Sequence, residues 1–522
     1  MSYTLHRFRL DAFERRLYQD NIAARASAVS TLVVLPTGLG KTVVAIKVMD
    51  AVLAERGGAV LLMAPTRPLA EQHYQLITKF YLNPSSVSLM TGELPPDERL
   101  PLWHSSDIIV ATPQVVRNDI VSGADLTRFS LLIFDECHRA TGDYPYTDIA
   151  AEYLRLRSEP LVLAMTASPG GNMEKVRQMC LSLGIRHIET RTEEDADVSP
   201  YVRGTEVRWK ELELPSAIIR VASELRNIYE SKIQSLQLLD ILPADFKGSV
   251  KELLGSAGRI QELYGGRGAG QMFRAMKLHA EALKIGHALL LAETQPLSTV
   301  KSYLKRMEKD ATARPRSAAA SIVRDPRFIS ATNILSKTTD ENPKIGALVE
   351  ELRNALAAGM KRVLVFTQYR ETVEELVSKL SSINGVRVDK LIGQGARGNE
   401  RGLKQKEQIE VLSRFREGKL NVLVSTSVGE EGLDIAATDL VIFFEPVPSE
   451  IRTIQRKGRT GRSAPGSVLV LMNKNTADEA YYHASRRKER IMKENLMRLD
   501  EHLQDATSYR IKKQSSLLDF SH

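Results

Sequence analysis

The sequence predicts an α/β protein in which two parallel-sheet domains flank a helical segment. Short apolar strand patterns alternate with helical patterns over residues 30–190, and the same alternation returns over residues 362–473. These strand patterns are continuously apolar, as expected for parallel strands that helices cover on both faces. The residues between the two blocks have helical spacing instead. A chain of 522 residues is also too long for one ordinary core.

The expected strands can be placed from the apolar runs. In the first block they fall at residues 31–35, 59–64, 107–111, 131–135 and 161–166. In the second block they fall at residues 362–366, 421–425, 439–444 and 467–472. A longer helical pattern separates each run from the next, which is the βαβ arrangement that builds a parallel sheet.

The middle segment, residues 216–330, is expected to be helical and basic. Two sets of apolar residues have the spacing of one helix face: Ile218, Val221, Leu225 and Ile228, then Leu297, Val300, Leu304 and Met307. Glycines at 265–268 predict a break between helices. The segment holds 18 Lys and Arg against 11 Asp and Glu, so +7 of the formal net charge of +8 lies here. This charge suits a polyanionic partner.

Composition excludes several other classes of protein. The only cysteines are Cys137 and Cys180, so a disulfide framework is excluded. The apolar runs are far too short to cross a bilayer, and no charged N-terminal segment leads into an apolar core. We therefore expect a cytoplasmic protein with no secretory signal and no membrane segment.

The stretch LPTGLGKT, Leu35 to Thr42, follows an expected strand and opens a helical pattern. Glycines in such a loop let backbone N–H groups face phosphates, and the helix N-terminus adds positive potential. Lys41 would reach the β and γ oxygens, and Thr42 would hold Mg²⁺. Because Leu35 stands where the strict pattern has glycine, a chance glycine turn is the alternative. The nucleotide-binding residues predicted from this loop are Thr37, Gly38, Leu39, Gly40, Lys41 and Thr42.

The stretch FDECHRA, Phe134 to Ala140, sets two carboxylates beside a thiol and an imidazole. Asp135 ends an expected strand, where ligands sit in an open α/β sheet, and such an aspartate is the usual Mg²⁺ partner of a phosphate-binding loop. Glu136 would orient and deprotonate the attacking water. A zinc site is the alternative, but it needs more soft ligands at metal spacing than this chain offers. We expect Cys137 to be a packed core residue.

Several motifs together resemble the superfamily 2 helicases of the DExD/H group. PTGLGKT, DECH and QRKGRTGR carry the resemblance, and further matches follow in order along both blocks. In the first block they are RLYQ (16–19), APTRPLAEQH (64–73), ATPQV (111–115) and TASP (166–169). In the second block they are VFTQYRET (365–372), STSVGEEGLDI (425–435) and QRKGRTGR (455–462). The resemblance implies two RecA-like domains that hydrolyse ATP with Mg²⁺.

The resemblance also assigns residues to the nucleotide. It implies that Arg16 and Gln19 read the adenine and that Gly432 and Asp434 lie near the ribose. Gln455 and His138 resemble a link between the second and sixth motifs. Arg459 and Arg462 would stabilise the charge that develops on the γ-phosphate. Because these arginines belong to the second block, they reach the nucleotide only when the two blocks close on it; a basic surface turn is the alternative.

A second set of residues is expected to touch one nucleic-acid strand. By resemblance these residues are Arg67, Thr112, Gln114, Thr367, Gln368 and Thr426. Small hydroxyls and loop amides suit phosphates because they fix register without reading sequence. The alternative for each residue is a cap at a strand end.

The helical insertion narrows the resemblance to the branch of the archaeal Hef proteins and the Fanconi anaemia M helicase. The double-stranded-RNA sensors and Dicer helicases share this branch. In the Hef group the insertion acts as a thumb that grips branched DNA; an interdomain strut is the alternative. The expected domains are residues 1–200 and 340–475 for the two RecA-like parts, 216–330 for the thumb-like insertion, 476–513 for a basic helix and 514–522 for a tail.

The tail QSSLLDF resembles the sliding-clamp motif Q-x-x-L-x-x-F, with Gln514, Leu517 and Phe520 as the clamp-binding residues. A chance amphipathic end is the alternative, since the usual second aromatic is absent. No acidic nuclease motif is found, so we expect no nuclease activity, and a separate nuclease is a candidate partner.

The resemblance therefore implies an ATP-dependent 3′–5′ DNA helicase or translocase, nucleoid-associated, that acts on forks or four-way junctions in fork restart and repair. It would bind the sliding clamp (PCNA) through its tail. The rival functions are an ATPase stimulated by double-stranded RNA and a non-catalytic scaffold that joins clamp and junction. Intact Lys41, Asp135, Glu136 and Arg462 disfavour the scaffold.

Overall fold

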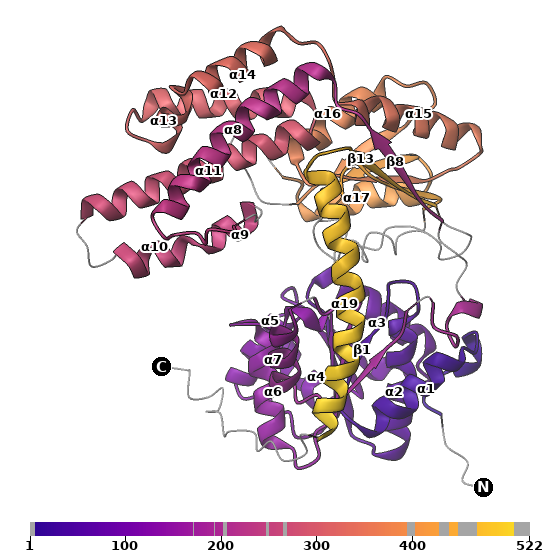
Figure 1. Cartoon of the computed structure of the whole chain (residues 1–522). Helices are drawn as coiled ribbons and strands as arrows, with labels where there is room; N and C mark the ends of the chain where they lie inside the picture. The colour runs from indigo at the N-terminus through magenta and orange to yellow at the C-terminus, as the bar shows by residue number, and fades with distance from the viewer. Residues whose placement is uncertain are drawn as a thin grey trace.

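The structure is a computed structural model with two α/β lobes, a helical insertion beside the second lobe and a long C-terminal helix between the lobes (Figure 1). It describes residues 6–505 apart from residues 171, 193, 202–205, 247–249, 265–268, 394–401, 427–437 and 447–466. The predicted fold class is confirmed: two parallel sheets flank a helical bundle.

Lobe 1 is built around a parallel sheet of seven strands in the order β3-β4-β2-β5-β6-β1-β7. The strands are β1 (Thr31–Val34), β2 (Ala59–Met63), β3 (Val87–Met90), β4 (Ile108–Ala111), β5 (Phe129–Asp135), β6 (Val162–Thr166) and β7 (His187–Thr190). All five expected strands are present. The sequence analysis missed β3 and β7, which form the two edges of the sheet.

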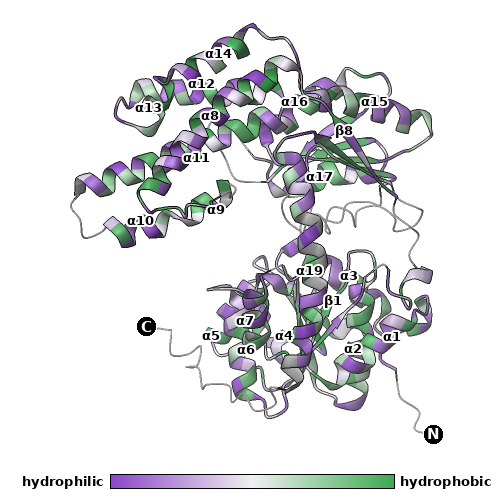
Figure 2. Ribbon diagram, viewed as in Figure 1, coloured by the Kyte–Doolittle hydropathy of each residue, from purple (hydrophilic) through white to green (hydrophobic). Residues whose placement is uncertain are grey.

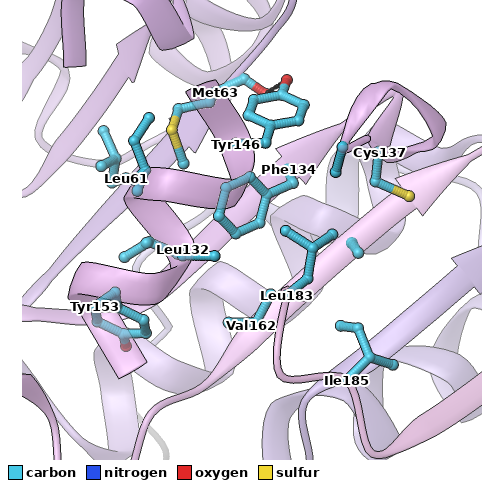
Figure 3. Close-up of a cluster of buried hydrophobic side chains, with 14 of the residues drawn as sticks. Leu61, Met63, Leu132, Phe134, Cys137, Tyr146, Tyr153, Val162, Leu183 and Ile185 are labelled. Atoms are coloured by element: carbon cyan, nitrogen blue, oxygen red, sulfur yellow. Dashed lines mark hydrogen bonds between the residues drawn. The ribbon is translucent and has the colours of Figure 1, made fainter. Parts of the chain in front are cut away.

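Helices cover both faces of this sheet. One face carries α1 (Leu17–Ala28), α2 (Lys41–Glu55) and α3 (Arg67–Phe80). The other carries α4 (Pro96–Ser105), α5 (Pro113–Val121), α6 (Pro145–Leu156) and α7 (Met173–Ser182). Short 3-10 helices lie at Leu10–Ala12, Pro84–Ser86, Cys137–Arg139 and Ser199–Tyr201. Figure 3 shows part of the core on the α6 face, with Tyr146, Phe134, Met63 and Cys137 in one apolar cluster.

Lobe 2 has a parallel sheet of six strands in the order β10-β11-β9-β12-β13-β8. Its strands are β8 (Glu206–Leu212), β9 (Val363–Phe366), β10 (Val388–Leu391), β11 (Val422–Ser425), β12 (Leu440–Phe443) and β13 (Ser467–Asn473). The helices α15 (Pro343–Ala357) and α16 (Arg370–Ser381) pack on one face, and α17 (Gln405–Arg416) packs on the other. Strand β8 precedes the insertion in the sequence, so the chain enters lobe 2, leaves it to form the insertion and then returns.

The insertion comprises seven helices in the described residues. They are α8 (Ser216–Leu238), α9 (Val250–Gly255), α10 (Ala257–Tyr264), α11 (Ala269–Thr294), α12 (Leu297–Ala313), α13 (Ala318–Val323) and α14 (Pro326–Lys337). Both apolar sets expected from the sequence are buried, one on α8 and one on α12. Gly286 brings α11 close to α8, because a Cβ there would lie 2.8 Å from the Tyr229 ring. The predicted break at 265–268 lies outside the described residues.

Helix α19 (Ala477–Asp505) joins the two lobes. It starts after β13, packs Tyr482 against Trp209 of β8, and reaches lobe 1, where Leu496 and Leu499 enter the core (Figure 1, yellow). Figure 2 shows that apolar residues concentrate in the two sheets while the helices are mixed in hydropathy. Among the helices described here, none combines the length and apolar character needed to cross a bilayer.

Candidate functional site

The phosphate-binding loop follows β1, where Gly38 and Gly40 have φ angles of +94° and +79°. Backbone of this left-handed kind favours glycine because it has no Cβ. At Gly40 space is limiting too, since a Cβ there would lie 2.6 Å from the Gln19 amide nitrogen. Helix α2 begins immediately afterwards, at Lys41. The loop therefore presents N–H groups and a helix N-terminus at the carboxyl end of a central strand, as phosphate binding requires.

Two side chains of α1 form hydrogen bonds with the backbone of the loop. The Tyr18 hydroxyl and the Gln19 amide both donate to the carbonyl of Leu39, at 2.7 and 3.1 Å. Gln19 is 2% exposed. The Lys41 ammonium donates to the carbonyl of Leu35 at 3.1 Å, so it lies folded back over the loop that it closes. Of the predicted nucleotide residues, Gln19 thus contacts Leu39, and Lys41 contacts Leu35 at the start of the same loop.

Asp135 lies at the end of β5, with β6 between it and β1 in the sheet. Its side chain is buried and accepts a hydrogen bond from His73 Nε2 at 2.8 Å. Burial alone would raise the pKa of Asp135, but the charge and hydrogen bond of His73 and the charge of Lys41 outweigh it and hold this pKa below its usual value. Asp135 is therefore ionised at neutral pH.

Glu136 has a left-handed backbone, with φ and ψ both 48°. A side chain other than glycine in this conformation costs about 1–2 kcal/mol, and such strain is concentrated at functional sites. Its Oε2 atom is buried, makes no hydrogen bond within the part of the chain that the structure describes, and lies 3.3 Å from His138 Nδ1. The same His138 nitrogen lies 3.0 Å from the Thr166 hydroxyl. The stretch DECH at the end of β5 is thus joined to TASP at the end of β6.

The oxygen ligands at this site fit a magnesium ion. Mg²⁺ prefers oxygen ligands and binds through one or two carboxylates together with phosphate oxygens. The structure offers the ionised Asp135 carboxylate and, in the first turn of α2, the Thr42 hydroxyl. Cys137 is fully buried in the apolar core, and burial raises the pKa of its thiol. Within the described ranges, no three His, Cys, Asp or Glu side chains gather as a metal site.

The expected nucleic-acid residues of lobe 1 follow β2 and β4. Arg67 begins α3 and pairs with Glu71 at 2.8 Å and with Glu93. Thr112 is at the N-cap position of α5, without a capping hydrogen bond from its side chain, and is 9% exposed, whereas the nearby Gln114 is exposed. All these residues lie at the carboxyl edge of the sheet, which is also the edge that carries the phosphate-binding loop.

In lobe 2 the matching residues follow β9 and β11. Thr367 is fully buried and donates its hydroxyl to Glu445 at 3.1 Å, and the backbone N–H of Gln368 donates to the same carboxylate at 2.5 Å. Thr426 is 7% exposed. The three residues lie together at the carboxyl edge, but the Thr367 hydroxyl is committed to Glu445. In this structure the Thr367 hydroxyl therefore fixes the loop after β9 to the loop after β12.

Some predicted site residues lie outside the described residues. They are Gly432, Asp434, Gln455, Arg459, Arg462, Gln514, Leu517 and Phe520. Arg16 is described: its guanidinium pairs with Glu14 at 2.8 Å and lies 5.8 Å from the centre of the Tyr201 ring.

Sequence reasoning missed His73, Tyr146 and Glu445. The Tyr146 hydroxyl lies 2.8 Å from the carbonyl of Asp135 and 3.1 Å from that of Met63, so it joins the ends of β5 and β2. His73, the last residue of APTRPLAEQH, could have been noticed because it is a polar residue at a core position of a helix. Nothing local marks Glu445, which becomes relevant only through the pairing of β12 with β9.

Comparison with known proteins agrees with this architecture. Three family models match: "DEAD/DEAH box helicase" at residues 16–176, "Helicase conserved C-terminal domain" at residues 343–464, and "Putative ATP-dependent RNA helicase, helical bundle" at residues 219–342. The crystal structure of the Pyrococcus furiosus Hef helicase domain is similar with a TM-score of 0.70 and 40% identity, over 92% of this chain and 100% of that one.

Curated relatives match over nearly the same share of the chain. A Methanocaldococcus jannaschii protein named as an ATP-dependent RNA helicase is 39% identical over 92% of this chain. The ATP-dependent DNA helicase MPH1 of Pyricularia oryzae is 32% identical, also over 92%. This chain spans 60% of the length of the first and 45% of the second.

Proposed function

Because this chain belongs to the superfamily 2 helicases, with the domain set of the Hef helicase domain, we propose that it is an ATP-driven DNA helicase or translocase that acts on forked or four-way-junction DNA. The observation that carries the proposal is the match to the complete Hef helicase domain at 40% identity. Lys41 follows β1, and Asp135 and Glu136 lie at the end of β5, two strands away at the same edge of the lobe 1 sheet; this arrangement supports the hydrolytic part.

Each residue of the ATP site has a task that follows from its chemistry. The loop N–H groups and Lys41 bind the phosphates, and Thr42 with Asp135 would hold Mg²⁺, which neutralises negative charge on the phosphate oxygens. Glu136 takes the proton of the attacking water, and its buried Oε2 atom, 3.3 Å from His138 Nδ1, supports this role. Arg459 and Arg462 would arrive from lobe 2 and complete the site upon closure.

The nucleic-acid part rests on residues at the carboxyl edges of both sheets. The expected nucleic-acid residues form one half-site on each lobe. If the lobes move relative to each other once per ATP, the two half-sites would step along one strand. The 3′–5′ direction is carried over from the family resemblance. The insertion, residues 216–330, is basic and packs against lobe 2, so it would grip duplex arms through phosphate contacts.

A second candidate is an ATPase stimulated by double-stranded RNA. The specific observation that favours it is the name of the helical-bundle model and of the M. jannaschii relative, both of which refer to an RNA helicase. The DNA helicases named MPH1 and the Hef domain favour DNA. A non-catalytic scaffold is the third candidate.

A phosphate-release assay with three nucleic acids of equal length separates these candidates. We expect forked DNA to stimulate ATP hydrolysis more than linear duplex DNA, and duplex RNA to stimulate it least. Greatest stimulation by duplex RNA would overturn the DNA assignment in favour of the second candidate. No phosphate release with any of the three would favour the scaffold. Strand displacement from the 3′ or 5′ tail of the fork then gives the polarity.

A further inference from the structure

His73 is a buried residue of lobe 1 that has no role in the proposed function. It lies on the second turn of α3, where its side chain turns into the protein and is 6% exposed as a residue. Its Nε2 atom meets Asp135 Oδ2 at 2.8 Å. Its Nδ1 atom is buried and has no hydrogen-bond partner among the described residues. The contact with Asp135 is therefore the polar interaction that fixes this ring.

The contact between His73 and Asp135 connects the part of the sheet that carries the nucleotide residues with the part that carries the expected nucleic-acid residues. Strands β5, β6 and β1 are neighbours and carry the nucleotide residues, whereas β2 and β4 carry the expected nucleic-acid residues Arg67 and Thr112. The boundary runs between β5 and β2. Tyr146 crosses it at the backbone, since its hydroxyl lies between the carbonyls of Met63 and Asp135. The His73 side chain also crosses this boundary, since α3 follows β2 and His73 bonds to Asp135 at the end of β5.

The carboxylate of Asp135 is almost inaccessible to water and meets His73 Nε2 at 2.8 Å, so its orientation depends on the groups that bond it within the protein. Residues that hydrogen-bond a metal-binding carboxylate set its orientation, and their loss typically lowers metal affinity about 10- to 100-fold.

We propose that His73 is a positioning residue, which donates from Nε2 to Asp135 and orients this carboxylate for the magnesium ion of the bound nucleotide. Helix α3 begins at Arg67, so the same rigid element carries an expected nucleic-acid contact and the donor that orients Asp135. The inference rests on the proposed ATPase function, and the experiment below keeps the two separable.

The test compares four variants with the wild-type chain. His73→Leu removes the donor, and His73→Asn provides an amide too short to replace Nε2. His73→Gln provides an amide that reaches its position. His104→Leu is the control, since His104 is an exposed histidine on α4. The first measurement is the affinity for a fluorescent ADP analogue, determined without metal and at increasing Mg²⁺ concentrations. The second is the Mg²⁺ concentration that gives half-maximal ATP hydrolysis.

For His73→Leu and His73→Asn we expect unchanged metal-free affinity for the nucleotide, because the phosphate-binding loop is intact. The Mg²⁺ concentration needed for half-maximal binding and hydrolysis should rise about 10- to 100-fold. His73→Gln should restore it to within a few-fold of wild type, and His104→Leu should match wild type. A role in folding alone would lower the unfolding temperature without moving the Mg²⁺ dependence of the folded protein.

Two results would overturn the proposal. One is a wild-type Mg²⁺ dependence in folded His73→Asn or His73→Leu. The other is a His73→Gln variant as impaired as His73→Asn, because the reach of the donor would then be irrelevant. If the wild type hydrolyses no ATP under any condition, the proposed function fails, while the binding titration still decides the role of His73.

Discussion

His187 of β7 lies against Asp500 of α19, with Nδ1 and Oδ1 2.9 Å apart. The backbone N–H of Ile188 donates to the same carboxylate oxygen at 2.6 Å. Just before Asp500, Leu496 and Leu499 are buried in the core of lobe 1. A helix that starts at the last strand of lobe 2 is therefore anchored at the edge strand of lobe 1, and it ties the two lobes together by a route separate from any bound nucleotide.

Replacing Leu496 and Leu499 by aspartate should release α19 from lobe 1. Each buried leucine contributes about 1.5–3 kcal/mol, so the docked state should become a minor one. We expect a larger radius of gyration in small-angle X-ray scattering of the nucleotide-free protein. Met497→Asp is the matched control, because Met497 lies on the same turn but is 49% exposed. An unchanged scattering curve for the double variant would show that α19 does not hold the lobes.

The fully buried ion pair of Lys344 and Asp478 should stabilise the junction between lobe 2, the insertion and α19. The two charged groups are 2.5 Å apart, and Lys344 also donates to the carbonyl of Thr294 at 3.1 Å. Lys344→Met should lower the free energy of unfolding by about 3–5 kcal/mol, since it leaves Asp478 buried and unpaired. Urea unfolding followed by tryptophan fluorescence, to which Trp103 and Trp209 both contribute, measures this.

The control for that pair is the double variant Lys344→Met, Asp478→Asn. Removing both charges should recover more than half of the loss. The single variant Asp478→Asn completes the cycle. A loss in the double variant equal to the sum of the losses in Lys344→Met and Asp478→Asn would mean that the pair does not act as a unit.

Glu341 should make the insertion sensitive to acid. Burial alone would raise the pKa of Glu341, but hydrogen bonds from the N–H groups of Leu297 and Asn342 and from Lys379, each at 2.9 Å, hold it below its usual value. A lowered pKa in the folded state stabilises the protein above the unfolded value of about 4.3, and this stabilisation is lost as the pH falls through the folded value.

The measurement is the difference in unfolding temperature between wild type and Glu341→Gln. The difference should be largest near neutral pH and should shrink as the pH falls below about 4.3. Glu211→Gln provides a comparison, because Glu211 is an exposed glutamate of β8. A difference that grows on acidification would contradict the assigned direction of the pKa shift.

Glu136→Gln should bind ATP and DNA and lose turnover by about 10²- to 10⁴-fold, the usual contribution of a general base. Lys41→Ala should lose both hydrolysis and unwinding, because the ammonium that binds the phosphates is gone. Phosphate release and equilibrium binding of a labelled fork measure the two quantities. Glu174→Gln, at an exposed position on α7, should behave as wild type. Retained turnover in Glu136→Gln would remove this residue from the catalytic step.

Truncation after Lys513 should abolish binding to a sliding clamp and leave ATP hydrolysis unchanged. The proposed contacts are Gln514, Leu517 and Phe520, which lie outside the described residues. The single variant Phe520→Ala should weaken clamp binding, whereas Ser521→Ala should not. Clamp pull-down that is unaffected by the truncation would refute the tail assignment.

The candidate nucleotide site could be predicted from the sequence alone. A phosphate-binding loop needs particular residue types at fixed local spacing, so Gly38, Gly40 and Lys41 could be found by reading along the chain. The same holds for Asp135 and Glu136 at a strand end. Central strands were equally predictable, because a strand buried on both faces must be apolar at every position.

The edge strands and the contacts between distant residues depend on the tertiary structure. All four strands that the sequence analysis missed are sheet edges: β3, β7, β8 and β10. They are partly exposed, so they need no continuous apolar run. The contacts of His73 with Asp135, of Glu445 with Thr367 and of His187 with Asp500 are likewise set by strand order and helix packing, which bring together residues that have no local spacing to reveal them.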